Sequence, residues 1–464
     1  MTLVFHQIFT PGLSQFSYLI GDDRSHTAAV VDPRADIDIY LRLARRDGVA
    51  ITHIFETHNH GDFLSGARAL SERAGRVPIY LGGDSAPAYG FDHVPIYDGD
   101  AFELGNVRLT VRHTPGHSPE HLAFELSEFD HPERPWGVLV GDSLLVGSVA
   151  APNLDLASVT GKQRVETLYH TLHQYHLQLA DDVILYPGHG PGAPLGARGS
   201  GRTSSTVGYE RRFNRLLQPM PLEEFQQHLT GQIEISGMYS TGLKQLNVEG
   251  PELLGHLPRL RGLPPEDFQQ LAAREGPTIL DTREMLAFGG GHIHAAINLG
   301  ARPEMSLWAA ALLDHRQPVL LVVADETQLS RIVRLLLRGG ITRFAGYLVG
   351  GMAAWHESGL ALAHIPQLSI HELQHELDEA QLLDVRTAHE WEKGHIPGAF
   401  HFPLIDLREK LPPLDRRRPV AIYCDNGYRA SAAASLLKFR GFPQVYNVPG
   451  SWQAWETAGY QVEA

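Results

Sequence analysis

The sequence Thr57-His-Asn-His-Gly-Asp-Phe63 directly follows the run Ile51-Thr-His-Ile-Phe-Glu56, whose β-branched and aromatic residues predict a strand. Two imidazoles and a carboxylate at alternating positions just beyond a strand can face one cavity. Three more polar clusters come later in the chain, at expected strand ends: His113-Thr-Pro-Gly-His117, Gly141-Asp142 and Tyr186-Pro-Gly-His189. A single histidine at such a position is usually a hydrogen-bonded surface residue, but four clusters in a chain with 26 histidines indicate a metal site.

The composition limits the classes of partner. A chain of 464 residues exceeds what one hydrophobic core usually fills, so several domains are expected. The 53 acidic and 39 basic residues give a net charge of -14, which argues against nucleic acid and against an anionic membrane as partners. No apolar run approaches the roughly 20 residues that cross a bilayer. The first residues have no basic segment followed by an apolar core, so we expect no signal peptide and a cytoplasmic location.

The second half of the chain contains an internal repeat. Leu280-Asp281-Thr-Arg283 recurs as Leu383-Asp384-Val-Arg386, and Gly291-His-Ile293 recurs as Gly394-His-Ile396, both 103 residues later. In each copy strands alternate with loops and helices, a pattern typical of βαβ units and mostly parallel sheets. The expected architecture is therefore one large α/β domain followed by two homologous smaller ones.

The four polar clusters, in order and spacing, resemble the metallo-β-lactamase fold over residues 1 to about 230. That fold is an αββα sandwich with the signature T-H-x-H-x-D-H, followed by a His, a bridging Asp and a last His. Where the dinuclear zinc hydrolases of the family have a second-site His, this chain has Phe63, which cannot bind a metal. The second site would retain only three ligands, with Asp142 as a bridge: His60, Asp62 and His189.

The other three ligands, His58, His117 and Asp142, form the set of two imidazoles and one carboxylate found in non-haem Fe(II) oxygenases. Within the superfamily this combination resembles the persulfide dioxygenases. The resemblance implies one Fe(II) per chain, with a small thiol persulfide and O₂ as substrates. His60, Asp62 and His189 would then orient the ligands from outside the coordination shell. Arg211 or Arg212 would hold a carboxylate of the thiol carrier, or else belong to a solvated helix face.

The single cysteine lies in Val420-Ala-Ile-Tyr-Cys424-Asp-Asn-Gly-Tyr-Arg429, between an expected buried strand and an expected helix. Backbone N–H groups and the helix dipole at such a position stabilise an anion. Residues 370 to 462 resemble rhodanese, and the six-residue loop from Cys424 to Arg429 has the length of the sulfurtransferases. The resemblance implies that Cys424 carries a persulfide and that Arg429 adds charge at the rim. The residues between them would contact the substrate: Asp425, Asn426, Gly427 and Tyr428.

In the first copy of the repeat, Ala324 stands where the nucleophile should be, and Asp325 and Glu326 would repel an anion. We therefore expect a rhodanese-like domain without activity. The whole order resembles the bacterial persulfide dioxygenase–sulfurtransferases of sulfide detoxification, in which sulfite and the cysteine persulfide give thiosulfate. The expected domains are a dioxygenase domain, a linker with the inactive domain, and the active rhodanese domain: 1–240, 241–365 and 366–464.

Two alternatives to this function remain open at the level of the sequence. One is a zinc thioester hydrolase of the type II glyoxalase kind with a fused sulfurtransferase, against which Phe63 argues. The other is a persulfide sensor or carrier with a vestigial metal site, against which the intact His58, His117 and Asp142 argue. For the protein as a whole we expect a homo-oligomer.

Overall fold

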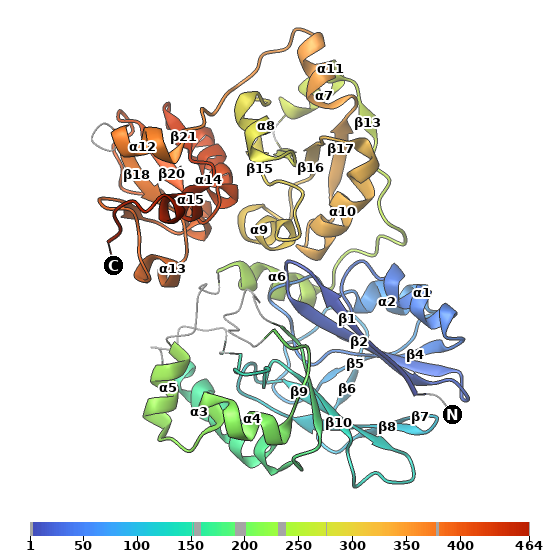
Figure 1. Cartoon of the computed structure of the whole chain (residues 1–464). Helices are drawn as coiled ribbons and strands as arrows, with labels where there is room; N and C mark the ends of the chain where they lie inside the picture. The colour runs from blue at the N-terminus through green and yellow to red at the C-terminus, as the bar shows by residue number, and fades with distance from the viewer. Residues whose placement is uncertain are drawn as a thin grey trace. The chain divides into compact units, whose positions relative to one another are not determined.

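The computed structural model describes residues 3–150, 152, 159–190, 201–230, 238–274, 276–376 and 380–463. It divides the chain into two compact units, Met1–His256 and Leu257–Ala464, which are described separately (Figure 1). Within the described residues, no helix combines the length and the apolar character needed to cross a membrane.

The first unit is built on two six-stranded sheets. In the first sheet β1 to β3 are antiparallel and β3 to β6 are parallel, in the order β1 (Leu3–Thr10), β2 (Gln15–Asp22), β3 (Thr27–Val31), β4 (Ala50–Phe55), β5 (Ile79–Gly82) and β6 (Val94–Ile96). The second sheet is antiparallel except for the parallel pair β10–β11, and its order is β12 (Ser205–Thr206), β11 (Ile184–Pro187), β10 (Gly137–Gly141), β9 (Leu122–Glu128), β8 (Val107–His113) and β7 (Ala101–Leu104).

The two-residue period of β2 shows how the layers form. Phe16, Tyr18 and Ile20 belong to the core between the two sheets, whereas Leu19 faces the helices outside the first sheet. Those helices are α1 (Asp38–Arg46) and α2 (Ala67–Arg73), and the outer face of the second sheet is covered by α3 (Val159–Gln174), α4 (Val207–Phe213) and α5 (Leu222–Thr230). This confirms the expected αββα sandwich.

The second unit contains two parallel sheets, as expected from the repeat. The five-stranded sheet has the order β13 (Gly262–Leu263), β17 (Phe344–Leu348), β16 (Val319–Val322), β14 (Thr278–Asp281) and β15 (Ile297–Asn298). The four-stranded sheet has the order β19 (Phe400–His401), β18 (Gln381–Asp384), β20 (Val420–Tyr423) and β21 (Val445–Asn447). In both repeats an Asp ends the corresponding strand and pairs with the Arg two residues later: Asp281 with Arg283 and Asp384 with Arg386.

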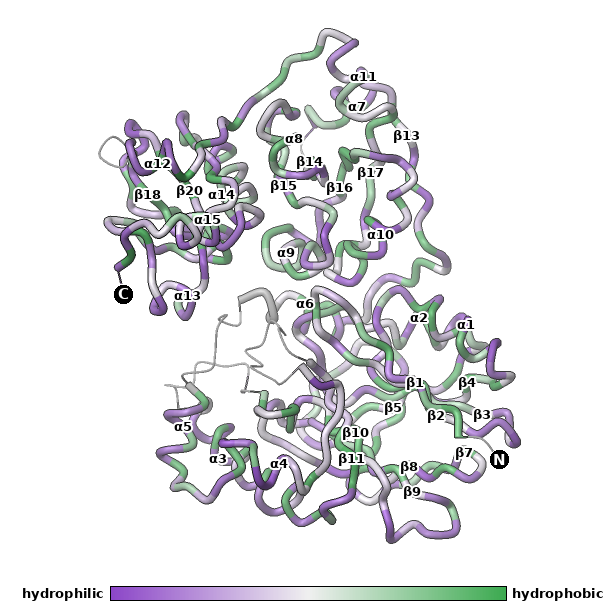
Figure 2. The backbone as a smooth tube through the Cα atoms, in the orientation of Figure 1, coloured by the Kyte–Doolittle hydropathy of each residue, from purple (hydrophilic) through white to green (hydrophobic). Residues whose placement is uncertain are grey.

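Helices flank both sheets of this unit. Those of the first repeat are α7 (Pro265–Ala272), α8 (Met285–Gly290), α9 (Met305–Leu312), α10 (Leu329–Arg338) and α11 (Gly351–Glu357). Those of the second are α12 (Ile370–Glu376), α13 (Ala388–Glu392), α14 (Tyr428–Phe439) and α15 (Ser451–Thr457). Hydrophilic and hydrophobic residues alternate along α10 (Figure 2), as in a helix with one face on the core.

Helix α14 differs from α10 because nearly all of its residues are buried. Its small side chains, Ala430 to Ser435, allow close packing against β20 and β21 of its own sheet and against α8 and β15 of the preceding repeat. Two hydrogen bonds fix this second contact. The Ser431 hydroxyl donates to Asn298 Oδ1 at 2.6 Å, and the Asn298 backbone N–H donates to the Ser435 hydroxyl at 3.1 Å.

Candidate functional site

His58, His117 and Asp142 come together at the ends of strands from both sheets of the first unit. They follow β4, β8 and β10, all three are buried, and one donor atom of each lies within 4.8 Å of the others. Asp142 Oδ2 is 3.7 Å from His58 Nε2 and 3.8 Å from His117 Nε2. In the part of the chain that the structure describes, His58 Nε2 and Asp142 Oδ2 have no hydrogen-bond partner. Buried atoms of this kind need a partner, and a divalent metal ion would satisfy them.

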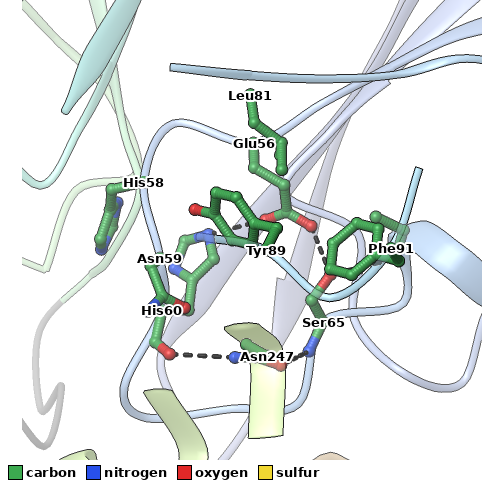
Figure 3. Close-up of a pocket in the computed structure, with 10 residues that line it drawn as sticks. Glu56, His58, Asn59, His60, Ser65, Leu81, Tyr89, Phe91 and Asn247 are labelled. Carbon is green, nitrogen blue, oxygen red and sulfur yellow. Dashed lines mark hydrogen bonds and ion pairs between the residues drawn. The ribbon is translucent and has the colours of Figure 1, made fainter. Parts of the chain in front are cut away.

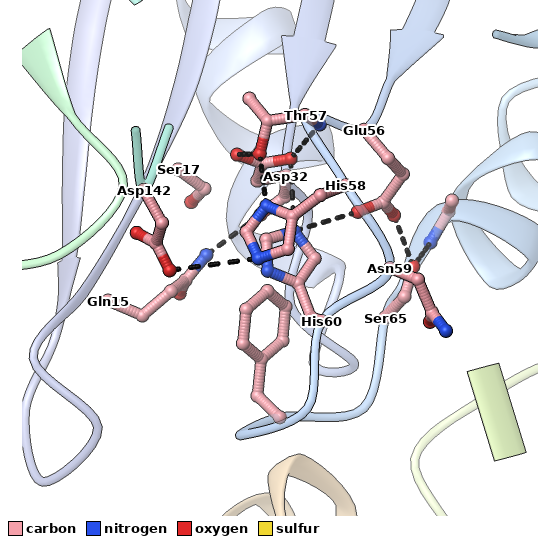
Figure 4. A network of polar contacts seen from close by, with 12 residues as sticks. Gln15, Ser17, Asp32, Glu56, Thr57, His58, Asn59, His60, Ser65 and Asp142 are labelled. Carbon is pink, nitrogen blue, oxygen red and sulfur yellow. Dashed lines mark hydrogen bonds and ion pairs between the residues drawn. The ribbon is translucent and has the colours of Figure 1, made fainter. Parts of the chain in front are cut away.

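His58 is held with its Nε2 atom available to a metal. The Thr57 hydroxyl donates to Asp32 Oδ2 at 2.9 Å, so the contact of 2.9 Å between Thr57 Oγ1 and His58 Nδ1 has the imidazole N–H as its donor (Figure 4). This assigns the lone pair of the ring to Nε2. Burial lowers the pKa of His58, and the neutral imidazole that results is the form that binds metal.

Asp142 has its two carboxylate oxygens in different roles. His189 donates through Nδ1 to Asp142 Oδ1 and contacts Asp62 Oδ2 through Nε2, both at 2.7 Å. Burial would lower the pKa of His189, but the charges of the two carboxylates raise it to about 10. Burial would likewise raise the pKa of Asp142, but His189 holds it well below its usual range. His189 thus joins Asp62 to Asp142 and leaves Oδ2 of Asp142 free for a metal.

His60 lies beside His58, with the ring centroids 4.2 Å apart. Its Nε2 atom is 3.1 Å from Asp32 Oδ1 and 3.1 Å from Glu56 Oε2 (Figure 4). Burial opposes the charged form, but the two carboxylates raise the pKa of His60 well above its usual value. The fully buried Phe63 ring packs on the imidazole with the ring centroids 4.3 Å apart. Among the described residues, His60 is therefore not grouped with Asp62 and His189. It forms a second buried group with Asp32 and Glu56, whose donor atoms lie within 4.8 Å of one another, as those of a metal site do.

A small pocket borders His60 on the side of Glu56. Figure 3 shows Tyr89, Phe91, Ser65 and Asn247 around it, and the pocket also touches His58. Asn247 comes from α6 (Met238–Glu249) and donates through Nδ2 to the backbone carbonyls of His60 and Phe63, at 2.9 and 3.0 Å. These bonds fix the backbone of the metal-site loop.

Sequence reasoning missed several residues that support the ligands. His121 accepts the backbone N–H of Asp142 at Nε2, at 3.0 Å, and its ring stacks on His58 with the centroids 5.1 Å apart. His121 comes four residues after His117, so the sequence could have indicated it as a member of this cluster. Its contact with Asp142 could not be seen in the sequence. The two arginines expected to hold a carboxylate of the thiol carrier differ in their surroundings. Arg211 donates to Asp181 and to the backbone carbonyls of Leu177 and Leu179. Arg212 is exposed.

In the second unit, Cys424 lies between β20 and α14 and is fully buried. The Gly427 N–H donates to Cys424 Sγ at 3.1 Å, and the Cys424 N–H donates to the Ser451 hydroxyl at 3.1 Å. Gly427 has a φ of +101°, in the left-handed region that favours glycine. Two side chains of the loop form hydrogen bonds with residues of the same domain. Asn426 Oδ1 accepts the Tyr428 N–H at 3.1 Å, and Asp425 Oδ2 accepts from Gln453 at 2.7 Å.

The charge of Arg429, expected at the rim of this loop, is paired with a carboxylate. Its guanidinium donates to both carboxylate oxygens of Glu390, at 2.7 and 2.5 Å. Burial opposes ionisation of Glu390, but Arg429 lowers its pKa to about 2. The positive charge near Cys424 is therefore shared with a carboxylate of α13.

The preceding repeat lies against the Cys424 loop. A Cβ atom on Gly427 would be 2.8 Å from the sulfur of Met285, and the Arg302 guanidinium is 5.5 Å from the centre of the Tyr428 ring. The corresponding loop of that repeat has Ala324 in place of the cysteine, and its acidic side chains bind the loop itself: Asp325 accepts from Thr327, and Glu326 accepts from the Gly350 N–H at 2.9 Å.

The stacked sheets with their His-His-Asp group define a metallo-β-lactamase domain, and the two parallel sheets define rhodanese-like domains. Residues 10–128 match the metallo-beta-lactamase superfamily, and residues 264–358 and 369–458 each match the rhodanese-like domain. A solved structure of a metallo-beta-lactamase from Staphylococcus aureus subsp. aureus COL is 27% identical, with a TM-score of 0.66, and the match covers 75% of this chain and 99% of that one.

Two curated relatives match the first half of the chain. Human mitochondrial persulfide dioxygenase ETHE1 is 30% identical over 233 residues, which are 48% of this chain and 79% of the human protein. A hydroxyacylglutathione hydrolase of a Synechococcus strain is 28% identical over 218 residues, which are 44% of this chain and 84% of that protein. The chain belongs to the ETHE1 family of the metallo-β-lactamase superfamily, in a form with two rhodanese-like domains fused behind the first domain.

Proposed function

We propose that the chain is a non-haem Fe(II) persulfide dioxygenase coupled to a rhodanese sulfurtransferase. It oxidises low-molecular-weight thiol persulfides to sulfite and thiosulfate. The observation that carries the proposal is the buried group His58, His117 and Asp142, in which His58 Nε2 and Asp142 Oδ2 have no hydrogen-bond partner among the described residues. The human relative named persulfide dioxygenase supports the same activity.

The residues of the first unit would hold the metal. His58, His117 and Asp142 would ligate Fe(II), which when bound supplies electron transfer to O₂ and open positions for ligands. Thr57 keeps His58 in the tautomer that binds metal, and His189 orients Asp142. Phe63 excludes water and a second cation from the space beside His60. In the net reaction one persulfide, one O₂ and one water give one thiol, one sulfite and two protons.

Cys424 would carry sulfane sulfur in the second unit. Its thiolate takes the terminal sulfur of a persulfide, and the carrier thiolate leaves. The sulfur bound to Cys424 then forms a bond to sulfite, and thiosulfate departs while the cysteine thiolate is released. The Gly427 N–H, 3.1 Å from Sγ, stabilises the negative sulfur in both states. Because both sites belong to one chain, the effective concentration of the intermediate is raised.

The alternative is a zinc thioester hydrolase, since hydroxyacylglutathione hydrolases are among the relatives. That chemistry uses two metal ions in this superfamily. Phe63 in place of a ligand argues against a second ion at the position that these hydrolases use, since its ring packs on His60.

Metal analysis of protein purified without oxygen tests the proposal, together with an oxygen electrode. One iron per chain and O₂ uptake on addition of a thiol persulfide are expected. Two zincs per chain, with thioester hydrolysis and no O₂ uptake, would establish the hydrolase. Protein that retains no metal but still binds a persulfide would instead be a carrier or sensor.

A further inference from the structure

Three buried side chains that are not among the proposed iron ligands gather next to His58. Asp32 directly follows β3, Glu56 directly follows β4, and His60 lies in the loop beyond β4 (Figure 4). These three residues are 1%, 5% and 2% exposed, and one possible ligand atom of each lies within 4.8 Å of the others. The group therefore joins the ends of two parallel strands to the loop that carries His58.

The spacing of the three side chains fits a metal ion. His60 Nε2 is 3.1 Å from Asp32 Oδ1 and 3.1 Å from Glu56 Oε2. Ligand atoms that bind a tetrahedral or octahedral ion at about 2.1 Å lie about 3.0 to 3.4 Å from one another. Phe63 packs on the face of the His60 ring, whereas a metal ion would bind at the Nε2 edge of that ring.

Two of these atoms lack the hydrogen bonds that buried polar atoms usually have. Among the described residues, His60 Nε2 and Glu56 Oε2 have no hydrogen-bond partner, although they lie 3.1 Å apart. Their contact thus has the distance of an ion pair but not the direction of a hydrogen bond. A cation between the two atoms would satisfy both of them.

Protein side chains do not balance the charge of the group. In the part of the chain that the structure describes, neither Asp32 nor Glu56 forms an ion pair with an arginine or a lysine, and His60 is the ion-pair partner of both. A protonated His60 can compensate one of the two carboxylates, which leaves one buried negative charge. A divalent cation bound to the neutral imidazole compensates both carboxylates.

The outer oxygens of the group are held by hydrogen bonds, as in protein metal sites. The Thr57 backbone N–H donates to Asp32 Oδ1 at 2.7 Å, and its hydroxyl donates to Asp32 Oδ2 at 2.9 Å. The Ser65 hydroxyl donates to Glu56 Oε1. A cavity of about 20 Å³ borders Glu56 and His60 (Figure 3), and this volume is sufficient for one water molecule, which would complete the coordination.

We propose that Asp32, Glu56 and His60 bind a divalent cation that is distinct from the proposed iron and ties the loop carrying His58 to the ends of β3 and β4. The cation is Mn²⁺, because carboxylates outnumber imidazoles in this group and carboxylate oxygens suit Mn²⁺. Mn²⁺ is also the most weakly bound of the divalent first-row metals. With three protein ligands, the ion exchanges with the solution and is lost when the protein is desalted.

Electron paramagnetic resonance measures this binding, because the signal of free Mn²⁺ disappears when the ion binds. Protein loaded with Fe(II) and kept without oxygen should bind one Mn²⁺ per chain and retain its iron. Glu56→Gln and His60→Gln should each lower the affinity for Mn²⁺ by more than the factor of about 10 to 100 that the loss of an outer partner causes. Glu210→Gln is the matched control, since it changes an equally buried carboxylate elsewhere in the first unit, and it should bind Mn²⁺ like the native protein.

A second measurement uses the native protein and does not depend on the folding of any variant. Pulsed electron paramagnetic resonance of the bound Mn²⁺ should detect one imidazole nitrogen, from His60, whereas an ion held by His58 and His117 would show two. Two nitrogens, or a release of iron in step with the uptake of manganese, would place the ion in the proposed iron site and overturn the proposal.

Two further results would also overturn it. One is the absence of binding at millimolar Mn²⁺, since His60 would then be an imidazolium between two carboxylates. The other is an unchanged affinity in Glu56→Gln. A native protein that holds no iron, yet binds one Mn²⁺ through one imidazole nitrogen, would support this site and contradict the proposed iron centre alone.

Discussion

The hydroxyl group of Tyr428, four residues after Cys424, donates a hydrogen bond of 3.1 Å to the backbone carbonyl of Gly300 in the preceding repeat. The same repeat places Met285 against Gly427 and joins Asn298 to Ser431 of the following helix. A domain without a nucleophile thus contacts the loop and the helix that position the nucleophile of the next domain.

Removing this hydroxyl should weaken sulfur transfer without affecting the metal site. In Tyr428→Phe the loop loses one hydrogen bond, so the rate of sulfur transfer from thiosulfate to cyanide should fall about fivefold. O₂ uptake with a persulfide should not change. Tyr460→Phe is the control, since that hydroxyl contacts His371 in the same domain. Equal transfer rates in both variants would show that the Gly300 contact does not hold the loop.

The pair of Glu390 and Arg429 should make the stability of the second unit depend on pH. The pKa of Glu390 is lowered from 4.5 to about 2, so its contribution to stability is complete above pH 4.5. It is lost as the pH falls from there toward about 2. The free energy of unfolding of the native protein should exceed that of Glu390→Gln at pH 5, and the difference should shrink by pH 3.

Urea denaturation at these two pH values measures the difference. Glu392→Gln, an exposed residue of the same helix, serves as the control and should show a small effect at both. A difference between the native protein and Glu390→Gln that stayed constant with pH would mean that the ion pair does not form in solution.

The metal ligands could be predicted because each one lies within four residues of the end of a strand, and strand ends are recognisable from local patterns. The contacts that hold the metal-site loop could not be predicted in this way. Asn59 and Lys244, which are 185 residues apart in the chain, meet only after α6 has packed on this loop. Local patterns in the sequence do not contain such distant contacts.

The same limit applies to the partners of two site residues. His60 belongs to the metal motif, yet its ring pairs with Asp32, directly after the neighbouring strand β3, and with Glu56. Arg429 closes the cysteine loop in sequence, yet its guanidinium binds Glu390, 39 residues earlier. In both cases the sequence predicted where the residue lies along the chain. The orientation of its side chain depends on a carboxylate that is distant in sequence.

Restoring a second metal site should require two changes. Phe63→His supplies the missing ligand, and Glu56→Ala removes a carboxylate that holds His60 away from the site. We expect the metal content of the double variant, grown with excess zinc and measured by mass spectrometry, to rise from one toward two ions per chain. Phe63→His alone should change it less. A content of one ion in the double variant would show that Asp32 is sufficient to hold His60.

Thr57 should affect the metal site by orienting His58. In Thr57→Val the hydroxyl that accepts the His58 Nδ1–H is lost, so the affinity for iron should fall about 10- to 100-fold. His117→Ala removes a ligand and should abolish O₂ uptake. Neither change should alter sulfur transfer from thiosulfate to cyanide. A loss of transfer in His117→Ala would mean that the two activities do not reside in separate sites.

Cys424 should be the point at which sulfane sulfur is bound, and the chain contains no other thiol. After exposure to a persulfide, mass spectrometry should find added sulfur on this residue alone. Arg429→Ala should lower thiosulfate output only in part, because the Gly427 N–H that meets Sγ remains. Arg429→Ala also leaves the half-buried Glu390 without its partner. Glu390→Gln should therefore be measured as well, because it breaks the same ion pair but keeps the charge of Arg429.

Cys424→Ser should separate the two halves of the reaction. A serine hydroxyl ionises at a much higher pH than a thiol and supplies no soft anion, so it cannot hold sulfur against the Gly427 N–H. The variant should therefore keep its iron and its O₂ uptake, but its product should shift from thiosulfate to sulfite. Ion chromatography of the products measures this ratio. If the variant still produced as much thiosulfate as the native protein, sulfite and persulfide would be combining without the rhodanese domain, and the coupled mechanism would have to be abandoned.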